Sequence, residues 1–196
     1  RTTKSIKMLP QLMKTQNKLV VAGNLLNEEI KKLGSFGQRV INHPSKTVII
    51  AGGAKVSDKI NVLKQFVHVG VKAIFIGGKM VNSFLIAQKE KLKITPFSLT
   101  DIPRTLLSSK EENNKNFINE VALAVEILDF AKEKKVNLIL PEDYKCVDEF
   151  KAPTFFIESE PDFERVLQLD LGPETIENFK NTILSNGIEN IFWNGP

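Results

Sequence analysis

The stretch VIIAGGAKVSDK, residues 48–59, decides the fold. A short run of apolar residues ends in two glycines, which is typical of a buried parallel strand that turns into a helix. Gly52 and Gly53 carry no Cβ, so their backbone can approach a ligand closely. Lys55 and Lys59 follow four positions apart, and both ammonium groups can reach a ligand at the glycine turn. The stretch is therefore either an ordinary strand-to-helix turn or a phosphate site.

The same order of strand, glycine turn and helix recurs along the chain. We expect strands over 47–51, 72–76, 137–141, 153–159 and 190–196, and helices over 57–69, 80–89, 116–135 and 173–186. This alternation predicts a doubly wound, Rossmann-like α/β fold, a parallel sheet with helices on both faces. Ligands of such sheets bind at the carboxyl ends of the strands, where Gly77-Gly78 and Asn194-Gly195-Pro196 join the first glycine pair.

The pattern divides the chain into three parts. Residues 1–21 carry no assignable pattern, and residues 22–46 predict a helix that ends at Gly34 and a turn into the first strand. Residues 47–196 form the α/β domain. Within it, the polar stretch 90–115 contains two prolines and predicts a long surface excursion.

Composition narrows the class of protein. The 196 residues are 42% hydrophobic and 26% charged, as in a soluble globular protein, and no apolar run is long enough to span a bilayer. The net charge of +4 favours an anionic partner such as a phosphorylated small molecule. Nucleic acid is disfavoured because the 27 basic residues are scattered.

Cysteine and histidine add little chemistry. Cys146 is the only cysteine, so no internal disulfide forms, a reducing compartment is expected, and we interpret the residue as a small buried hydrophobe. His43 and His68 are too isolated for a metal site. No metal ligand is therefore predicted from these side chains.

The residues alone leave the glycine stretch open. Ser57 and Asp58 suit the start of the following helix, whose exposed amide groups favour an anion. Against this, glycines are common at strand-to-helix turns and lysines are common on surfaces. The stretch also matches neither G-x-x-x-x-G-K-[ST] nor G-x-G-x-x-G, so the residues by themselves favour an ordinary turn.

Five strings nevertheless resemble, in the same order, motifs of the phosphoglycerate kinase family. They are AGNLLNEEI, GGAKVSDKI, IFIGGKM, LDLGPET and WNGP, and they span residues 22–196 with a gap at 90–115. The resemblance implies the C-terminal, nucleotide-binding half of a hinged two-domain kinase, with residues 22–46 as the link between domains. It implies transfer of a phosphoryl group between 1,3-bisphosphoglycerate and ADP in glycolysis.

The resemblance also implies site residues around the first loop. Gly53, Ala54 and Lys55 would border the nucleotide, and Lys55 would act catalytically by touching the transferring phosphoryl group. Lys59 would hold the nucleotide phosphates. The cofactor is Mg²⁺ bound to ADP or ATP, with no protein metal ligand expected. Positive charge and positioning are what a metaphosphate-like transition state needs.

Later motifs supply the rest of the implied site. Gly77 and Gly78 would lie beside the adenine, and Leu169 would help to wall it. Asn194 and Pro196 would lie near the ribose and phosphates.

The chain departs from the family at two positions and lacks two parts. Lys79 and Gln168 stand where the family usually has glycine, both next to the adenine pocket. The N-terminal domain that binds 3-phosphoglycerate or 1,3-bisphosphoglycerate is missing, as is the final Gly-rich loop. We therefore expect a fragment that is inactive alone, from a monomeric cytoplasmic enzyme. The alternatives are a catalytically dead relative serving as a binding or regulatory module, and an unrelated α/β protein sharing only the loop.

Overall fold

The computed structural model divides into two compact units, residues 1–38 and 39–196. The structure describes residues 8–21, 23–90, 111–148, 155–158, 166–185 and 187–195. The first unit contains the short helix α1 (Leu9–Thr15) and most of α2 (Asn24–Asn42). All other described elements belong to the second unit.

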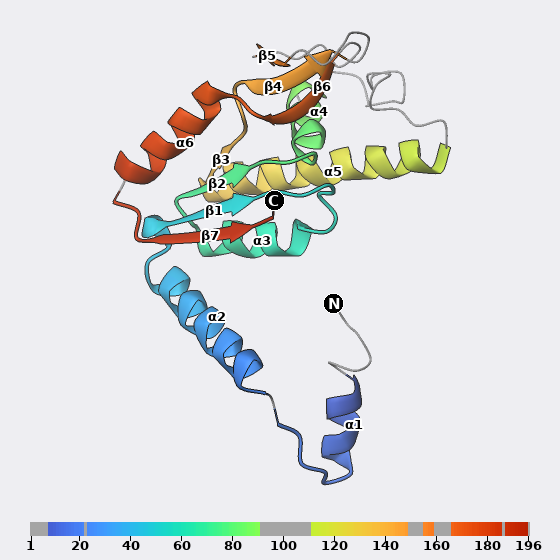
Figure 1. Ribbon diagram of the computed structural model, residues 1–196, viewed down its shortest axis with the longest axis vertical. Helices are drawn as coiled ribbons and strands as arrows, with labels where there is room; N and C mark the ends of the chain where they lie inside the picture. Colours follow the sequence, from blue (N-terminus) through green and yellow to red (C-terminus); the bar gives the residue numbers. More distant parts are fainter. Residues whose placement is uncertain are drawn as a thin grey trace. The chain divides into compact units, whose positions relative to one another are not determined.

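A parallel four-stranded sheet forms the centre of the second unit (Figure 1). Its strands are β1 (Thr47–Ala51), β2 (Ala73–Ile76), β3 (Asn137–Ile139) and β7 (Asn190–Asn194). They lie in the order β3-β2-β1-β7, and every neighbouring pair is parallel. β2 is fully buried and β1 nearly so, as expected for a parallel sheet covered on both faces.

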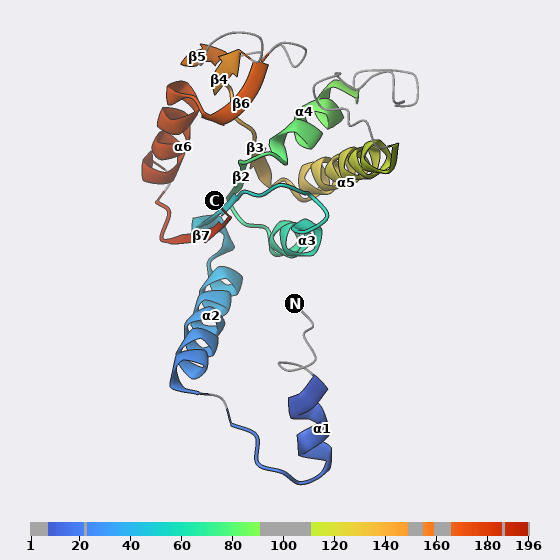
Figure 2. The ribbon, with the colours of Figure 1, turned by 45° about the vertical axis from the view of Figure 1, so that its right-hand side comes forward.

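Helices pack on both faces of this sheet, which confirms the predicted fold class. The helices are α3 (Ile60–Val69), α4 (Val81–Glu90), α5 (Glu111–Lys134) and α6 (Pro173–Ser185). Figure 2 shows α6 on one side of the sheet and α3, α4 and α5 on the other. On the α6 side, the ring centroids of Phe75 and Phe179 lie 4.4 Å apart. On the α3 side, those of Phe66 and Phe192 lie 5.3 Å apart.

A second, antiparallel sheet was not predicted. It contains β4 (Tyr144–Asp148), β5 (Phe155–Glu158) and β6 (Val166–Leu171), in the order β5-β4-β6. Only β5 falls within an expected strand, 153–159. No strand was predicted over β4, because its mixture of polar and apolar residues gives no apolar run, although Tyr144 and Cys146 alternate with polar neighbours and are buried. The burial of Cys146 confirms its interpretation as a small core residue.

Two helices are longer than the sequence predicted. α2 does not end at Gly34 but continues to Asn42. α2 contains two glycines, Gly34 and Gly37, each of which costs about 1 kcal/mol, but good helix formers lie on both sides of them, Lys31–Leu33 before and Gln38 and Arg39 after. α5 begins at Glu111, so residues 111–115 of the expected excursion are helical. The remainder of that excursion, 91–110, lies outside the described residues.

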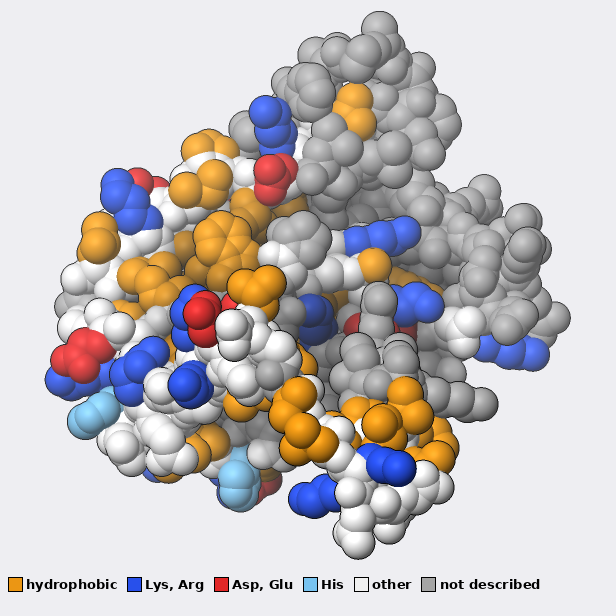
Figure 3. Space-filling view, turned by 60° about the horizontal axis from the view of Figure 1, so that its bottom comes forward, with side chains coloured by type: hydrophobic (Ala, Val, Ile, Leu, Met, Phe, Trp, Pro, Cys, Tyr) orange, Lys and Arg blue, Asp and Glu red, His pale blue; other side chains and the backbone are white. Residues whose placement is uncertain are grey.

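The surface carries dispersed charge. On the face shown in Figure 3, lysine and arginine side chains are spread among other side chains and do not form one patch. Within the described part of the chain, no helix combines the length and apolar character needed to cross a membrane.

Candidate functional site

Backbone hydrogen bonds bring three glycine-containing loops together at the carboxyl edge of the parallel sheet. The Gly52 amide after β1 donates to the Asn194 carbonyl at the end of β7, at 3.0 Å. The Gly77 amide after β2 donates to the Ala51 carbonyl, at 2.8 Å. The strand order β2-β1-β7 therefore places the three loops side by side, as the sequence predicted.

The glycines make this close packing of loops possible. Gly78 has φ +66°, and a Cβ there would lie 2.8 Å from the Gly53 nitrogen. Met80 N donates to the Gly53 carbonyl at 2.9 Å, which fastens the same two loops. A Cβ on Gly195 would lie 2.2 Å from the Gly52 oxygen. Contact between backbones, which sequence reasoning did not consider, therefore requires glycine at these positions.

Lys59 is held at the meeting point of two loops. It is the N-cap of α3, half-buried, and no side-chain hydrogen bond caps that helix start. Its ammonium donates to the Asn194 side-chain oxygen. Its Cε lies 3.4 Å from where a Cβ on Gly53 would stand. Lys55 is exposed in the preceding loop, so two cations flank a helix N-terminus that carries its own partial positive charge.

The helix after the lysines starts later than predicted. α3 begins at Ile60 instead of at residue 57, and neither Ser57 nor Asp58 caps it. Both donors of Ser57 are instead bound by Glu120 of α5: the amide by Oε2 at 2.8 Å and the hydroxyl by Oε1 at 2.6 Å. Sequence reasoning missed Glu120, because a partner 63 positions away leaves no local signal.

Other predicted residues of the loops lie at the surface. Ala54 and Lys79 are exposed, and Gly77 is half-buried. A Cβ on Gly77 would meet nothing within 4 Å, so open space borders that residue. This open side is the one available to a flat ligand.

Two predicted residues are not brought to these loops by any described contact. Leu169 lies in β6 of the second sheet, where the register with β4 skips it between Gln168 and Asp170. Its side chain is not among the described ones, and Pro196 lies outside the described residues. Their expected places beside the base and ribose stay predictions.

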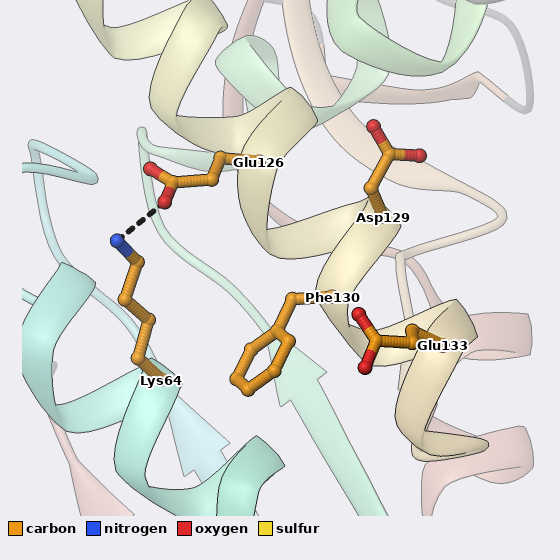
Figure 4. Close-up of a pocket in the computed structure, with 5 residues that line it drawn as sticks. All are labelled: Lys64, Glu126, Asp129, Phe130 and Glu133. Atoms are coloured by element: carbon orange, nitrogen blue, oxygen red, sulfur yellow. Dashed lines mark ion pairs between the residues drawn. The ribbon is translucent and has the colours of Figure 1, made fainter.

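A hollow between α3 and α5 offers different chemistry (Figure 4). It is lined by Lys64, Glu126, Asp129, Phe130 and Glu133. Its one lysine is paired with Glu126 at 2.5 Å, and the other two charged residues are acids. Repulsion between carboxylates and phosphate makes the hollow unsuited to a nucleotide's phosphates.

The start of α6 shows how the chain satisfies a helix N-terminus with its own carboxylate. Asp143 is 2% exposed, and its two oxygens accept from the amides of Glu174 at 3.1 Å and Thr175 at 2.7 Å. The Thr175 hydroxyl adds a third bond, at 2.6 Å. Desolvation by burial raises the pKa of Asp143, but the hydrogen bonds from Thr175 and Glu174 outweigh it and leave the pKa lowered.

The comparisons with known proteins agree on one family. The family model described as phosphoglycerate kinase matches residues 1–196. A phosphoglycerate kinase of Lactobacillus delbrueckii subsp. lactis is 37% identical over 187 residues, covering 94% of this chain and 39% of that protein. One of Chlorobium phaeobacteroides (strain BS1) is 34% identical over 179 residues, covering 90% of this chain and 38% of that protein.

Solved structures show the same likeness. The phosphoglycerate kinase structure from Coxiella burnetii matches with a TM-score of 0.63 at 26% identity, covering 89% of this chain and 39% of that one. The structure from Pyrococcus horikoshii OT3 shares the fold, with a TM-score of 0.69 at 20% identity over 100% of this chain and 43% of that one. The chain thus spans about two fifths of the length of these relatives. Together with the ordered motifs and the glycine loops, these matches show that the chain belongs to the phosphoglycerate kinase family.

Proposed function

We propose that this chain is the nucleotide-binding part of a phosphoglycerate kinase, which moves a phosphoryl group between 1,3-bisphosphoglycerate and ADP. One observation carries the proposal: Lys59 and Lys55 flank an α3 start without a side-chain cap, where three glycine loops meet. A polyphosphate is bound by cations, by unpaired backbone amides and by glycine backbone that can approach it closely.

Each group of the edge has a separate task in this proposal. Lys59 holds the nucleotide phosphates with the donors that Asn194 leaves available. Lys55, which is exposed, follows the transferring phosphoryl group as its charge develops. The open side of Gly77, in the loop that Gly78 packs against Gly53, receives the adenine. Mg²⁺ arrives bound to ADP or ATP as part of the substrate and neutralises phosphate charge.

The rest of the reaction belongs to parts of the protein beyond this chain. The chain spans 38% of the curated relative from Chlorobium, so we place the site for 3-phosphoglycerate or 1,3-bisphosphoglycerate outside it. The chain alone should therefore not catalyse transfer. We extend to the full-length protein the monomeric, cytoplasmic character that the resemblance implies.

A coupled assay of phosphoryl transfer tests this proposal. The full-length protein carrying this chain should form ATP from ADP and 1,3-bisphosphoglycerate, and residues 1–196 alone should not. Lys55→Ala should lower kcat by about 100-fold, because charge aimed at the transferring group typically contributes that much. Lys64→Ala, which removes a lysine outside the site, is the matched control and should leave kcat unchanged. A full-length protein without activity would contradict the proposal.

A catalytically dead family member that acts as a binding or regulatory module is the second candidate. Lys79 favours it, because a long exposed side chain on the loop beside Gly78 can occupy the adenine slot. In that case the full-length protein would neither bind Mg-ADP nor catalyse transfer, and Lys79→Gly would restore binding. Tight Mg-ADP binding by the unchanged protein would exclude this candidate.

A further inference from the structure

We propose that Glu120 is a positioning residue for the lysine loop, residues 54–58, which carries Lys55. The inference rests on the proposed function, because it assigns Glu120 a role through Lys55 and no contact with substrate. The observation behind it is the clamp on Ser57, whose amide and hydroxyl both donate to the Glu120 carboxylate. Hydrogen bonds to an ionised acceptor are shorter and stronger than those between neutral groups.

The lysine loop has few other attachments. Of its five side chains only Val56 is buried, at 0% exposure, while Ala54, Lys55 and Asp58 are exposed. The Val56 carbonyl accepts from the Lys59 amide at 2.9 Å, which forms the turn into α3. The Val56 anchor and the neighbouring Ser57 clamp therefore fix the backbone directly after Lys55.

Glu120 extends from a well-anchored part of α5. The next residue, Val121, is 2% exposed, and Ala124 is fully buried. Six residues after Glu120, Glu126 forms an ion pair with Lys64 of α3 at 2.5 Å. The same helix thus holds both the lysine loop and the helix that follows it, so the loop is fixed relative to α3.

Positioning matters more for Lys55 than for Lys59. The Lys59 ammonium is already held by its hydrogen bond to the Asn194 side chain at the end of β7. Within the described part of the chain no side chain or backbone group binds the Lys55 ammonium, so the direction of its side chain depends on the backbone that carries it. A displacement of about 1 Å at a reacting group can cost up to a hundredfold in rate. Loss of the clamp should therefore reduce kcat and leave nucleotide affinity nearly unchanged.

The test compares variants of the full-length protein in the coupled assay. Glu120→Ala should lower kcat about tenfold with KM for ADP changed less than twofold. Ser57→Ala keeps the amide bond and should lower kcat less. The double variant should be no slower than Glu120→Ala alone. Glu133→Ala removes an exposed carboxylate further along the same helix, away from the lysine loop, and is the matched control, with kcat unchanged.

Two further measurements keep the inference separate from the proposed function. Glu120→Gln, which retains one good acceptor, should recover part of kcat, which a purely structural role would not require. Amide exchange at Ser57 should accelerate in Glu120→Ala, whether or not the protein is active. Faster exchange with unchanged kcat would overturn the positioning role. The positioning role would also be overturned if Glu120→Ala changed kcat and KM equally, or if the effects of the two substitutions were additive in the double variant. An inactive wild-type protein would overturn the proposed function, and the positioning role with it.

Discussion

Two helix starts in the same unit treat their exposed amides in opposite ways. At α6 the chain supplies a buried anion, Asp143, which accepts from the first-turn amides of Glu174 and Thr175. At α3 it supplies a cation, Lys59, at the N-cap and no side-chain cap. Both helix ends carry the same partial positive charge. The first is neutralised within the fold, and the second remains available to an anion from outside.

The comparison separates structure from function. At the start of α6, hydrogen bonds tie Asp143, the residue before β4, to the first turn of the helix. The packing there is tight, since a Cβ on Gly172 would lie 2.2 Å from the Asp143 carboxylate. The loop before α3 instead contacts Gly78 through Gly53, and open space borders the adjacent Gly77. We infer that the first helix start stabilises the fold and the second binds the nucleotide.

The largest expected effect is on protein stability at the start of α6, where Asp143 binds the first-turn amides. Asp143→Ala removes the cap of α6 and leaves the amides of Glu174 and Thr175 short of acceptors, while the Thr175 hydroxyl keeps the Asp143 carbonyl at 3.1 Å. Each such loss costs about 1–3 kcal/mol, so the free energy of unfolding should fall by about 3 kcal/mol or more. Denaturant titration measures it. Glu142→Ala, next to Asp143 but exposed, is the control and should cost less than about 1 kcal/mol. Equal losses would mean that the buried network contributes nothing special.

The second effect distinguishes two adjacent glycines, Gly77 and Gly78, in the loop after β2. Gly78→Ala places a Cβ 2.8 Å from the Gly53 nitrogen at φ +66°, and should destabilise the protein by about 2 kcal/mol. Gly77→Ala meets nothing within 4 Å and should leave stability unchanged while weakening Mg-ADP binding. Thermal unfolding and titration of both variants check this. Equal destabilisation of both would remove the distinction between a packing glycine and a ligand-facing one.

The third effect concerns how Lys59 is held. Asn194→Ala removes its acceptor and should weaken Mg-ADP binding about fivefold, which corresponds to roughly 1 kcal/mol for one hydrogen bond. If Asn194 acts through Lys59, the double variant with Lys59→Ala should bind no more weakly than Lys59→Ala alone. Additive losses would instead show that Asn194 contacts the nucleotide directly.

The smallest effect is on the acid side of the stability profile. The pKa of Asp143 is lowered in the folded state, so its contribution is complete above its unfolded pKa of about 3.9. That contribution is lost as the pH falls through the lower folded value. Below about pH 4 the free energy of unfolding should therefore decrease more steeply in the wild type than in Asp143→Asn. Parallel profiles would show that the Asp143 carboxylate does not titrate with unfolding.

Local signals in the sequence were enough for the parallel sheet and its loops. Apolar runs that end in glycine identified β1 and β2, and the same runs placed Lys55 and Lys59 at the sheet edge. The reason for Gly78 and Gly195 could not be predicted, since it depends on the approach of loops from different strands.

Long-range polar contacts were beyond the same reasoning. Ser57 suits a helix cap by its type, but a carboxylate 63 residues away binds it instead. The sequence around Asp143 predicts no role for it, whereas its burial and its bonds to Thr175, 32 positions away, make it the cap of α6. Such partners depend on the packing of whole elements, which local patterns do not encode.

Calorimetric titration of the full-length protein with Mg-ADP tests the central claim most directly, with Lys59→Ala and Lys64→Ala compared in parallel. Both lysines belong to the α3 region, but only Lys59 lies at the open helix start. We predict that the unchanged protein binds, that Lys59→Ala weakens binding at least tenfold, and that Lys64→Ala binds like the wild type. Undiminished binding by Lys59→Ala, or equal losses in both variants, would contradict the claim that the open start of α3 holds the nucleotide phosphates.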